Sequence, residues 1–279
     1  MSWYMGEKGM TANKLASPQT TVHISLQGKG GVGKTLVASI LVQYFRQKGL
    51  TVYPVDTDPV NHSLAQYREL GVQSLEVLRD GRVDQRTFDG LLERLLTESG
   101  VFVVDSGAST FIPLWYYMLE NRVFDCLRNS GRRIVIHSVI TGGQAMADTL
   151  SGFAEVARTS RERSIVVWLN EYFGYIQQDG SSFGEMATCR DNEQKILGSV
   201  GIARRNQDTF GRDIEEMIAS KLTFAEALRN GQFSIMAKQR LKIVRDELFE
   251  QLDALNLDEL RKSSTVTGSG AVEKTALAS

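Results

Sequence analysis

Residues 27–36 read QGKGGVGKTL, and this stretch decides the fold. It contains the pattern glycine, four residues, glycine-lysine-threonine, which Gly28 opens and Gly33, Lys34 and Thr35 close. An apolar run, TVHISLQ, leads into it, and the helix-favouring run KTLVASILVQYFRQKG follows. A phosphate-binding loop must lie between a strand and a helix, because backbone N–H groups at the helix N-terminus bind the phosphate oxygens. The stretch therefore predicts a site for the phosphates of a nucleotide.

The side chains of this loop have separate predicted tasks. Lys34 should reach the β- and γ-phosphates and take part in catalysis, and the Thr35 hydroxyl should ligate Mg²⁺. A second lysine, Lys29, stands at the mouth of the loop, where an ordinary phosphate-binding loop has no special requirement. The predicted nucleotide-binding residues of the loop are Gly28, Lys29, Gly30, Gly31, Val32, Gly33, Lys34 and Thr35.

Acidic residues follow two other predicted strands. Asp105 ends the apolar run VFVVD, and Asp56 and Asp58 occur in VDTDPVN, after the run LTVYPVD. A site for Mg²⁺ and a nucleoside triphosphate needs carboxylates at strand ends. We therefore expect Asp105 to hold Mg²⁺ through a coordinated water and Asp56 to belong to the same metal site. One member of the Asp56–Asp58 pair could orient the attacking water, or the pair could form only a turn and a helix cap.

The composition is that of an ordinary soluble globular protein. The 279 residues include 32 basic and 33 acidic side chains, which gives a net charge of −1. This balance argues against a nucleic-acid binder that depends mainly on electrostatics, although a local basic patch could still contact DNA. The two cysteines, Cys126 and Cys189, have no C-x-x-C spacing, so neither a disulfide framework nor a zinc site is expected. No apolar run is long enough for a membrane span and no secretory signal is visible, so a cytoplasmic protein is expected.

Apolar runs of strand type alternate with amphipathic runs of helix type along most of the chain. Such alternation predicts an α/β fold with one doubly wound, mainly parallel sheet and helices on both faces. We expect this single domain to span residues 21–262. Residues 1–20 are predicted to be a flexible extension, and the small, polar, aperiodic residues 263–279 a disordered tail.

The three motifs KGGVGKT, VDTDP and VVD together resemble the deviant Walker A ATPases of the ParA/MinD superfamily. The resemblance implies a protein that binds Mg·ATP, forms a homodimer around it and hydrolyses it slowly. It implies that Lys29 contacts phosphates across the dimer interface and that Asp58 serves hydrolysis. It further implies that Asn170, at the end of VVWLN, contacts adenine. By its position alone, Asn170 could equally be a strand-end residue that caps a turn.

Longer segments, among them IHSVITGGQAMADTLSGFAEVA and GRDIEEMIASKLTFAEAL, resemble a family of conjugal transfer proteins of broad-host-range plasmids over most of residues 21–257. This resemblance implies a role in plasmid conjugation, with partners in the conjugation machinery. Two alternatives remain open at this point. One is a plasmid-partition ATPase that works with partition proteins and binds DNA non-specifically. The other is a nucleotide-locked adaptor with negligible turnover.

The chain departs from the superfamily pattern near the predicted γ-phosphate position. Residues 106–108 are Ser-Gly-Ala where partition ATPases usually have a proline-bearing stretch, and residues 60–62 are Val-Asn-His where Gln-Gly-Asn is common. Nucleotide binding is therefore a safer prediction than turnover. The segment VVWLNEYFG lacks the aspartate of a guanine-recognition motif, so ATP is preferred over GTP.

Three further features lie outside these motifs. The apolar stripe of residues 238–261 favours a terminal helix docked on the domain over a partner-binding helix. The aromatic group 115–117 could pack on the sheet or form part of a partner surface. The three histidines, His23, His62 and His137, are scattered along the chain, which favours structural roles over metal binding.

Overall fold

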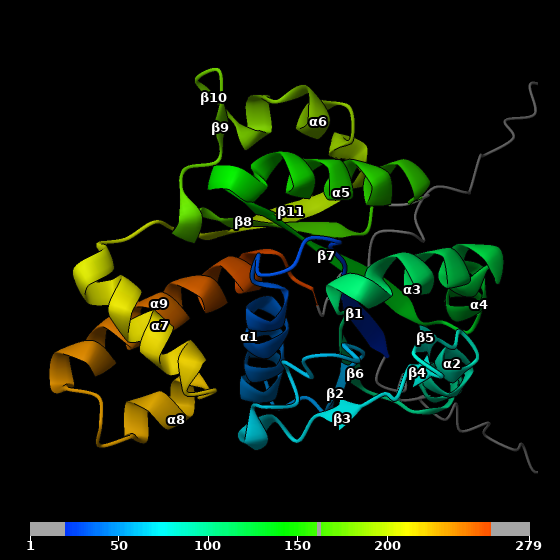
Figure 1. Ribbon diagram of the computed structural model, residues 1–279, viewed down its shortest axis with the longest axis horizontal. Helices are drawn as coiled ribbons and strands as arrows, with labels where there is room; N and C mark the ends of the chain where they lie inside the picture. Colours follow the sequence, from blue (N-terminus) through cyan, green and yellow to red (C-terminus); the bar gives the residue numbers. More distant parts are fainter. Residues whose placement is uncertain (1–19, 161–162, 258–279) are drawn as a thin grey trace, which may run out of the picture.

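A computed structural model of the chain describes residues 20–160 and 163–257. Its centre is a seven-stranded sheet in the order β11-β8-β7-β1-β6-β2-β3, and each neighbouring pair is parallel (Figure 1). The predicted α/β fold with a doubly wound parallel sheet is confirmed. The strands are β1 (Thr21–Ser25), β2 (Val52–Asp56), β3 (Gln73–Ser74), β6 (Val101–Asp105), β7 (Arg133–Thr141), β8 (Ile165–Asn170) and β11 (Ile196–Ile202). The predicted flexible ends, 1–20 and 263–279, lie outside the described residues apart from Thr20.

Helices cover both faces of this sheet, because side chains along each buried strand alternate between two apolar cores. In β6, Val101 and Val103 belong to the core beneath α1, α7, α8 and α9, whereas Phe102 and Val104 face α2, α3, α4 and α5. The helices are α1 (Lys34–Gln47), α2 (Thr87–Thr97), α3 (Ala108–Glu120), α4 (Val123–Asn129), α5 (Met146–Thr159), α6 (Ala187–Arg190), α7 (Arg212–Ala219), α8 (Phe224–Arg229) and α9 (Ile235–Ala254). Two small antiparallel hairpins, β4 (Leu78–Arg79) with β5 (Arg82–Val83) and β9 (Gln177–Gln178) with β10 (Ser181–Ser182), stand apart from the sheet.

The carboxyl ends of the central strands meet at one edge of the sheet. Asp56 at the end of β2 is in register with Asp105 at the end of β6, and Asp105 is in register with Ser25 of β1. Strand β1 lies between β6 and β7. The strands β2, β3 and β6 are on one side of it, and β7, β8 and β11, which come later in the chain, are on the other. Ligands of open α/β sheets bind in the crevice at such a reversal of strand order. The loop that begins after β1 therefore opens into this crevice.

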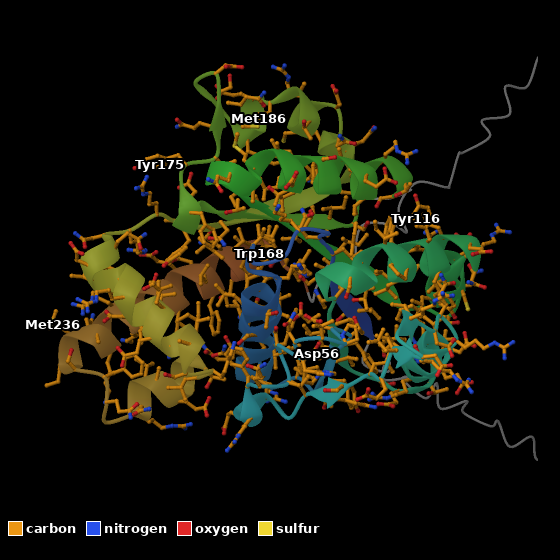
Figure 2. All side chains as sticks on the ribbon, in the orientation of Figure 1. Asp56, Tyr116, Trp168, Tyr175, Met186 and Met236 are labelled. Atoms are coloured by element: carbon orange, nitrogen blue, oxygen red, sulfur yellow. The ribbon has the colours of Figure 1, made fainter. Side chains whose placement is uncertain are left out.

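The terminal helix and two residues of the aromatic group pack into the apolar core. Helix α9 buries six side chains, which confirms the docked helix over its described part; residues 258–261 lie outside the described residues. Trp115 and Tyr117 are buried under α3, whereas Tyr116 is 54% exposed and lies at the outer surface in Figure 2. Two of the three aromatic side chains therefore pack in the core, where Tyr117 contacts Phe88 of α2 and Trp115 contacts Phe124 of α4. None of the helices within the described residues is long and apolar enough to cross a membrane.

Two of the three histidines form a buried hydrogen-bonded chain with a tryptophan. The Trp168 indole N–H donates to His137 Nδ1 at 2.9 Å, and His137 Nε2 lies 2.9 Å from His23 Nδ1. All three side chains are fully buried in the sheet. In the described part of the chain, no cluster of three or more His, Cys, Asp or Glu side chains could hold a metal ion. The hydrogen bonds give His23 and His137 a structural role in the core.

This hydrogen-bonded chain determines which ring nitrogen of each imidazole carries the proton, and NMR can measure it. An indole N–H only donates, so His137 must accept at Nδ1 and carry its proton on Nε2, and His23 must in turn carry its proton on Nε2. Burial lowers the pKa of His137 to about 3 and the pKa of His23 well below 6.5. We expect ¹⁵N NMR to show both rings neutral, as Nε2–H tautomers, down to about pH 5. A titration of either ring near pH 6.5 would contradict this arrangement.

The same burial sets the sign of a stability effect. In the unfolded chain both imidazoles take up protons below about pH 6.5, whereas in the folded chain they stay neutral. The unfolded state therefore binds more protons, and the contribution of the pair to the free energy of unfolding is complete above pH 6.5. It should decrease as the pH falls, by up to about 1.4 kcal/mol per pH unit for each histidine.

Candidate functional site

Glycine conformations build the loop between β1 and α1. Gly31 and Gly33 have φ values of 75° and 106°, a region that residues with a Cβ rarely adopt. A Cβ on Gly33 would also lie 2.9 Å from the Asn170 amide nitrogen. Helix α1 begins directly after Gly33, at Lys34, so its free N–H groups face the loop. This is the local structure of an anion-binding helix N-terminus.

Lys34 holds a positive charge at the centre of the loop. Its ammonium group donates to the Lys29 carbonyl oxygen at 2.8 Å, and only 7% of the residue is exposed. Burial lowers the pKa of the ammonium group, while Asp105 and Asp58 oppose the shift. A buried lysine with no anion in direct contact is costly, so this position favours an anionic ligand.

Thr35 and Asp105 form the other half of the phosphate end. The Thr35 hydroxyl donates to Asp105 Oδ2 at 2.7 Å, which joins the first turn of α1 to the end of β6. Asp105 Oδ1 is buried and accepts no hydrogen bond from any described residue. Burial raises the pKa of Asp105 to about 7, although the Thr35 hydrogen bond and Lys34 act in the opposite direction. A hydroxyl beside a carboxylate with an unpartnered oxygen is the hard oxygen donor set that fits Mg²⁺.

The two aspartates after β2 occupy different environments. Asp56 is fully buried, and both of its oxygens accept backbone N–H groups: Oδ1 from Asp58, and Oδ2 from Leu64 at 2.8 Å and Ala65 at 3.0 Å. Burial raises the pKa of Asp56, and these three hydrogen bonds oppose the shift. Asp56 therefore anchors the loop of residues 58–65, and its role as a metal ligand stays a prediction.

Asp58 caps a turn and also lines the cavity beside the phosphate loop. Its Oδ1 accepts the backbone N–H groups of Val60 at 3.0 Å and Asn61 at 3.2 Å. Both roles that the sequence left open, a turn cap and a site carboxylate, are therefore compatible with its position. Gly107 packs against it so closely that a Cβ there would lie 2.8 Å from Asp58 Cγ. The loop after β2 and the loop after β6 are thus in direct contact.

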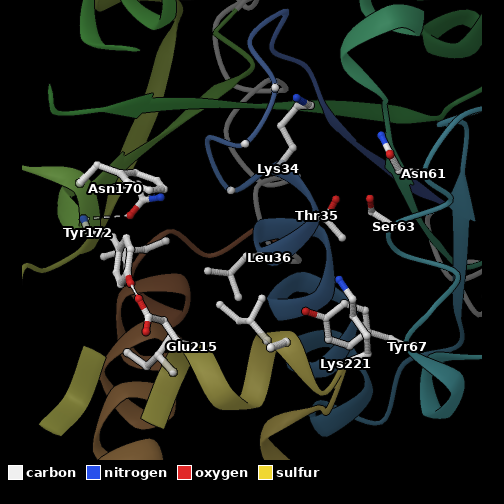
Figure 3. Close-up of a pocket in the computed structure, with 18 of the residues that line it drawn as sticks. Lys34, Thr35, Leu36, Asn61, Ser63, Tyr67, Asn170, Tyr172, Glu215 and Lys221 are labelled. Atoms are coloured by element: carbon white, nitrogen blue, oxygen red, sulfur yellow. Dashed lines mark hydrogen bonds between the residues drawn. The ribbon is translucent and has the colours of Figure 1, made fainter. Parts of the chain in front are cut away.

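A cavity of about 600 Å³ joins these groups to the end of β8 (Figure 3). At one end it is lined by Lys34, Thr35, Asp58 and Gly107, and at the other by Asn170, Tyr172 and residues of the β11–α7 connection. The first end carries the charged and hydroxyl groups. The second end offers an aromatic ring and an amide, which suit a nucleobase.

Hydrogen bonds hold Asn170 in place at the second end of the cavity. Its Nδ2 donates to the Val32 carbonyl oxygen at 2.9 Å, and its Oδ1 accepts the Tyr172 backbone N–H at 3.2 Å. The residue therefore caps the turn after β8 and also forms part of the cavity wall. Tyr172 lies below it in Figure 3, and its hydroxyl donates to Glu215 of α7. Adenine contact by Asn170 stays a prediction.

Lys29 lies at the mouth of the loop, with its side chain 46% exposed. Its ammonium group forms an ion pair of 2.8 Å with Asp148 in the first turn of α5. The backbone next to it is fixed by Gln27, whose amide donates to the carbonyl oxygens of Val139 at 3.1 Å and Thr149 at 3.0 Å. The remaining loop residues lie nearby: Gly28 against Phe111, Gly30 beside Ala108, and Val32 in the core. The fold thus brings all the predicted site residues to one edge of the sheet.

The family profile described as the CobQ/CobB/MinD/ParA nucleotide binding domain matches residues 24–228. The chain belongs to this family. The matched region includes the phosphate loop and the ends of β2, β6 and β8.

Two sequence relatives are similar to nearly the whole domain. They are proteins named TraL from Escherichia coli, 44% and 40% identical over 234 and 233 residues. The alignments cover 84% and 83% of this chain and 97% of each relative. The predicted similarity of the longer segments to a known protein family is thereby confirmed, with the TraL proteins as relatives.

Solved structures with a similar arrangement include MinD proteins. The MinC:MinD cell division complex of Aquifex aeolicus gives a TM-score of 0.49 at 13% identity, covering 84% of this chain and 96% of that chain. The septum site-determining protein MinD of Pyrococcus horikoshii OT3, solved with Mg-ADP, gives 0.49 at 17% identity, with 85% and 97% covered. These two structures are distant from the chain in sequence.

Several residues of the site carry no sequence signal of their own. Gln27, Asp148 and Tyr172 take part through contacts with residues far away in the chain. In the sequence, Gly107 is only a glycine two positions after the strand-end Asp105. Its close packing against Asp58 is visible in the structure alone.

Proposed function

We propose that the protein is a cytoplasmic ATPase that binds Mg·ATP, forms a homodimer around the nucleotide and acts as a slow switch in plasmid conjugative transfer. The observation that carries the proposal is the phosphate end of the cavity. There, the buried Lys34 ammonium group lies near the Thr35–Asp105 pair, whose Oδ1 is unpartnered within residues 20–160 and 163–257. Membership of the CobQ/CobB/MinD/ParA family supports a nucleotide as the ligand.

The residues of this chain would divide the work as follows. The loop N–H groups and Lys34 bind the phosphates, and Thr35 and Asp105 hold Mg²⁺, which neutralises phosphate charge when it is bound. Asp58, at the cavity surface, orients the attacking water. Asn170 lies at the base end, where an adenine would be placed.

A conjugative role rests on the similarity to the TraL proteins. The change from monomer to dimer would alter which protein of the conjugation machinery the chain binds. The near-neutral net charge does not favour DNA as the main partner.

The proposal is tested with the purified wild-type protein. Calorimetry should show one ATP bound per chain in Mg²⁺, light scattering should show a dimer with a non-hydrolysable ATP analogue, and phosphate release should be slow but measurable. Bound nucleotide without any phosphate release would indicate a nucleotide-locked adaptor instead. Absence of nucleotide binding would refute the proposal.

Asp58 and Asp56 make a matched pair for the hydrolysis step. Asp58→Asn removes the carboxylate that lines the cavity, so we expect phosphate release to fall by roughly 100-fold or more while ATP affinity changes only a few-fold. Persistence of the ATP-bound dimer should increase accordingly. Asp56→Asn should instead lower the melting temperature, because its buried carboxylate anchors three backbone N–H groups. If Asp56→Asn stops hydrolysis in a stable protein and Asp58→Asn does not, the two roles are reversed.

A further inference from the structure

Ser63 lines the cavity, although neither its residue type nor its position belongs to a nucleotide-binding motif. Its hydroxyl forms no hydrogen bond to any residue of the described chain. In Figure 3, Ser63 and Asn61 lie on the same side of the cavity as the Thr35 hydroxyl, away from Asn170 and Tyr172. A half-buried hydroxyl without a protein partner, turned toward a charged cavity, is available to a ligand.

The loop that carries Ser63 is held firmly at both ends. Asp56 Oδ1 accepts the Asp58 N–H at 2.8 Å, and Asp56 Oδ2 accepts the Leu64 N–H at 2.8 Å. The Leu64 side chain is fully buried in the core, so Ser63 is attached directly to a fixed point. Between these ends, His62 has a left-handed φ of 45°, which turns the chain sharply just before Ser63. The carboxylate of Asp56 thus fixes the backbone on both sides of Ser63.

The same loop touches the loop that follows Asp105. The close packing of Gly107 against Asp58 joins the two, and both contribute to the phosphate end of the cavity. Lys34 and Thr35 form the floor of that end, and the residues of the β2 loop form one side of it. A group bound by the Ser63 hydroxyl is therefore at the phosphate end rather than at the base end.

We propose that the Ser63 hydroxyl donates a hydrogen bond to the terminal phosphate of a bound nucleoside triphosphate. The loop of residues 58–65 then distinguishes a triphosphate from a diphosphate, because only the triphosphate reaches this hydroxyl. The Asp58–Gly107 contact would transmit its position to the loop after β6. This inference rests on the proposed nucleotide site and extends it by a residue that reads the state of the nucleotide.

The test compares affinities for a non-hydrolysable ATP analogue and for ADP, both in Mg²⁺, by calorimetry. Ser63→Ala should weaken binding of the triphosphate analogue by about tenfold or more and leave ADP affinity within about twofold of wild type. Ser63→Thr keeps the hydroxyl and should restore most of the preference for the triphosphate. Ser74→Ala, an exposed serine of β3 outside the cavity, is the matched control and should change neither affinity.

The outcomes separate the two proposals. If wild-type protein binds both nucleotides and Ser63→Ala keeps the wild-type preference for the triphosphate, the role of Ser63 is refuted and the nucleotide site stands. An equal loss of ATP-analogue and ADP affinity, in a variant with an unchanged melting temperature, also refutes the selective role. If wild-type protein binds neither nucleotide, the proposed function itself is refuted.

Discussion

Replacing Lys34 with alanine should reduce ATP affinity by about 100-fold or more and leave the chain folded. The ammonium group interacts electrostatically with Asp105 at the phosphate end of the cavity, and a charge-assisted contact with phosphate is among the stronger polar interactions in proteins. The fold should survive, because the substitution removes a buried charge whose desolvation is costly. The substitution also removes the positive charge of Lys34 from the surroundings of Asp105. Burial raises the pKa of this carboxyl to about 7, so it can become protonated when the ammonium group is removed.

Calorimetry with ATP in Mg²⁺ measures the effect, and Lys242→Ala is the matched control. Lys242 lies on the exposed side of α9, outside the cavity, and its removal should leave both affinity and melting temperature unchanged. Wild-type ATP affinity in the Lys34→Ala protein would refute the assignment of the phosphate loop.

The central sheet could be predicted because its strands are local, strongly apolar runs. The run VFVVD forms β6 over its full length and is buried on both faces. The run before the phosphate loop forms β1. Strand β3, by contrast, has only two residues, both exposed, and depends on pairing with β2 for its existence. Helix α3 contains Pro113, which in isolation argues against a helix interior. Packing of Phe111, Leu114 and Trp115 into the core outweighs that local preference.

The site could be predicted as far as its residues belong to a motif. Glycines at required left-handed positions and acids at strand ends are local signals, so the loop and Asp105 were accessible from the sequence. The partners that hold them in place were not. Gln27 binds a carbonyl oxygen 122 positions away, and Asp148 meets Lys29 only after β7 has paired with β1. Such contacts follow from topology, which the motif does not contain.

Lys29 is the residue for which the structure sharpens the prediction most. The resemblance implies a phosphate contact across a dimer interface, and in this single chain the Lys29 side chain is 46% exposed, with Asp148 as the counter-ion. Both side chains of this ion pair are substantially exposed, 46% and 58%, so it contributes only about 0–1 kcal/mol. The backbone of the loop is fixed by Gln27, whereas within residues 20–160 and 163–257 the ammonium group is held only by this weak pair. It can therefore exchange Asp148 for a stronger anion.

Asp148→Asn isolates that exchange from the rest of the site. The substitution removes the competing carboxylate and keeps the shape of the side chain. If Lys29 has to leave Asp148 to reach the phosphates of a second subunit, this variant should dimerise at equal or a few-fold lower protein concentration than wild type. A higher concentration requirement would mean that the ion pair supports the dimer.

Lys29→Ala should keep ATP affinity within a few-fold of wild type and abolish both ATP-dependent dimerisation and hydrolysis. The ammonium group of Lys34, not that of Lys29, lies inside the loop, so phosphate binding in the same chain needs no help from position 29. In a dimer closed around two nucleotides, the partner's phosphates would give Lys29 a multiply charged counter-ion in a site that excludes water, where electrostatic attraction is much stronger than at the surface. Size-exclusion chromatography with light scattering, with and without a non-hydrolysable ATP analogue, measures the change. A dimer that forms equally well in the Lys29→Ala protein would show that this lysine does not act across an interface.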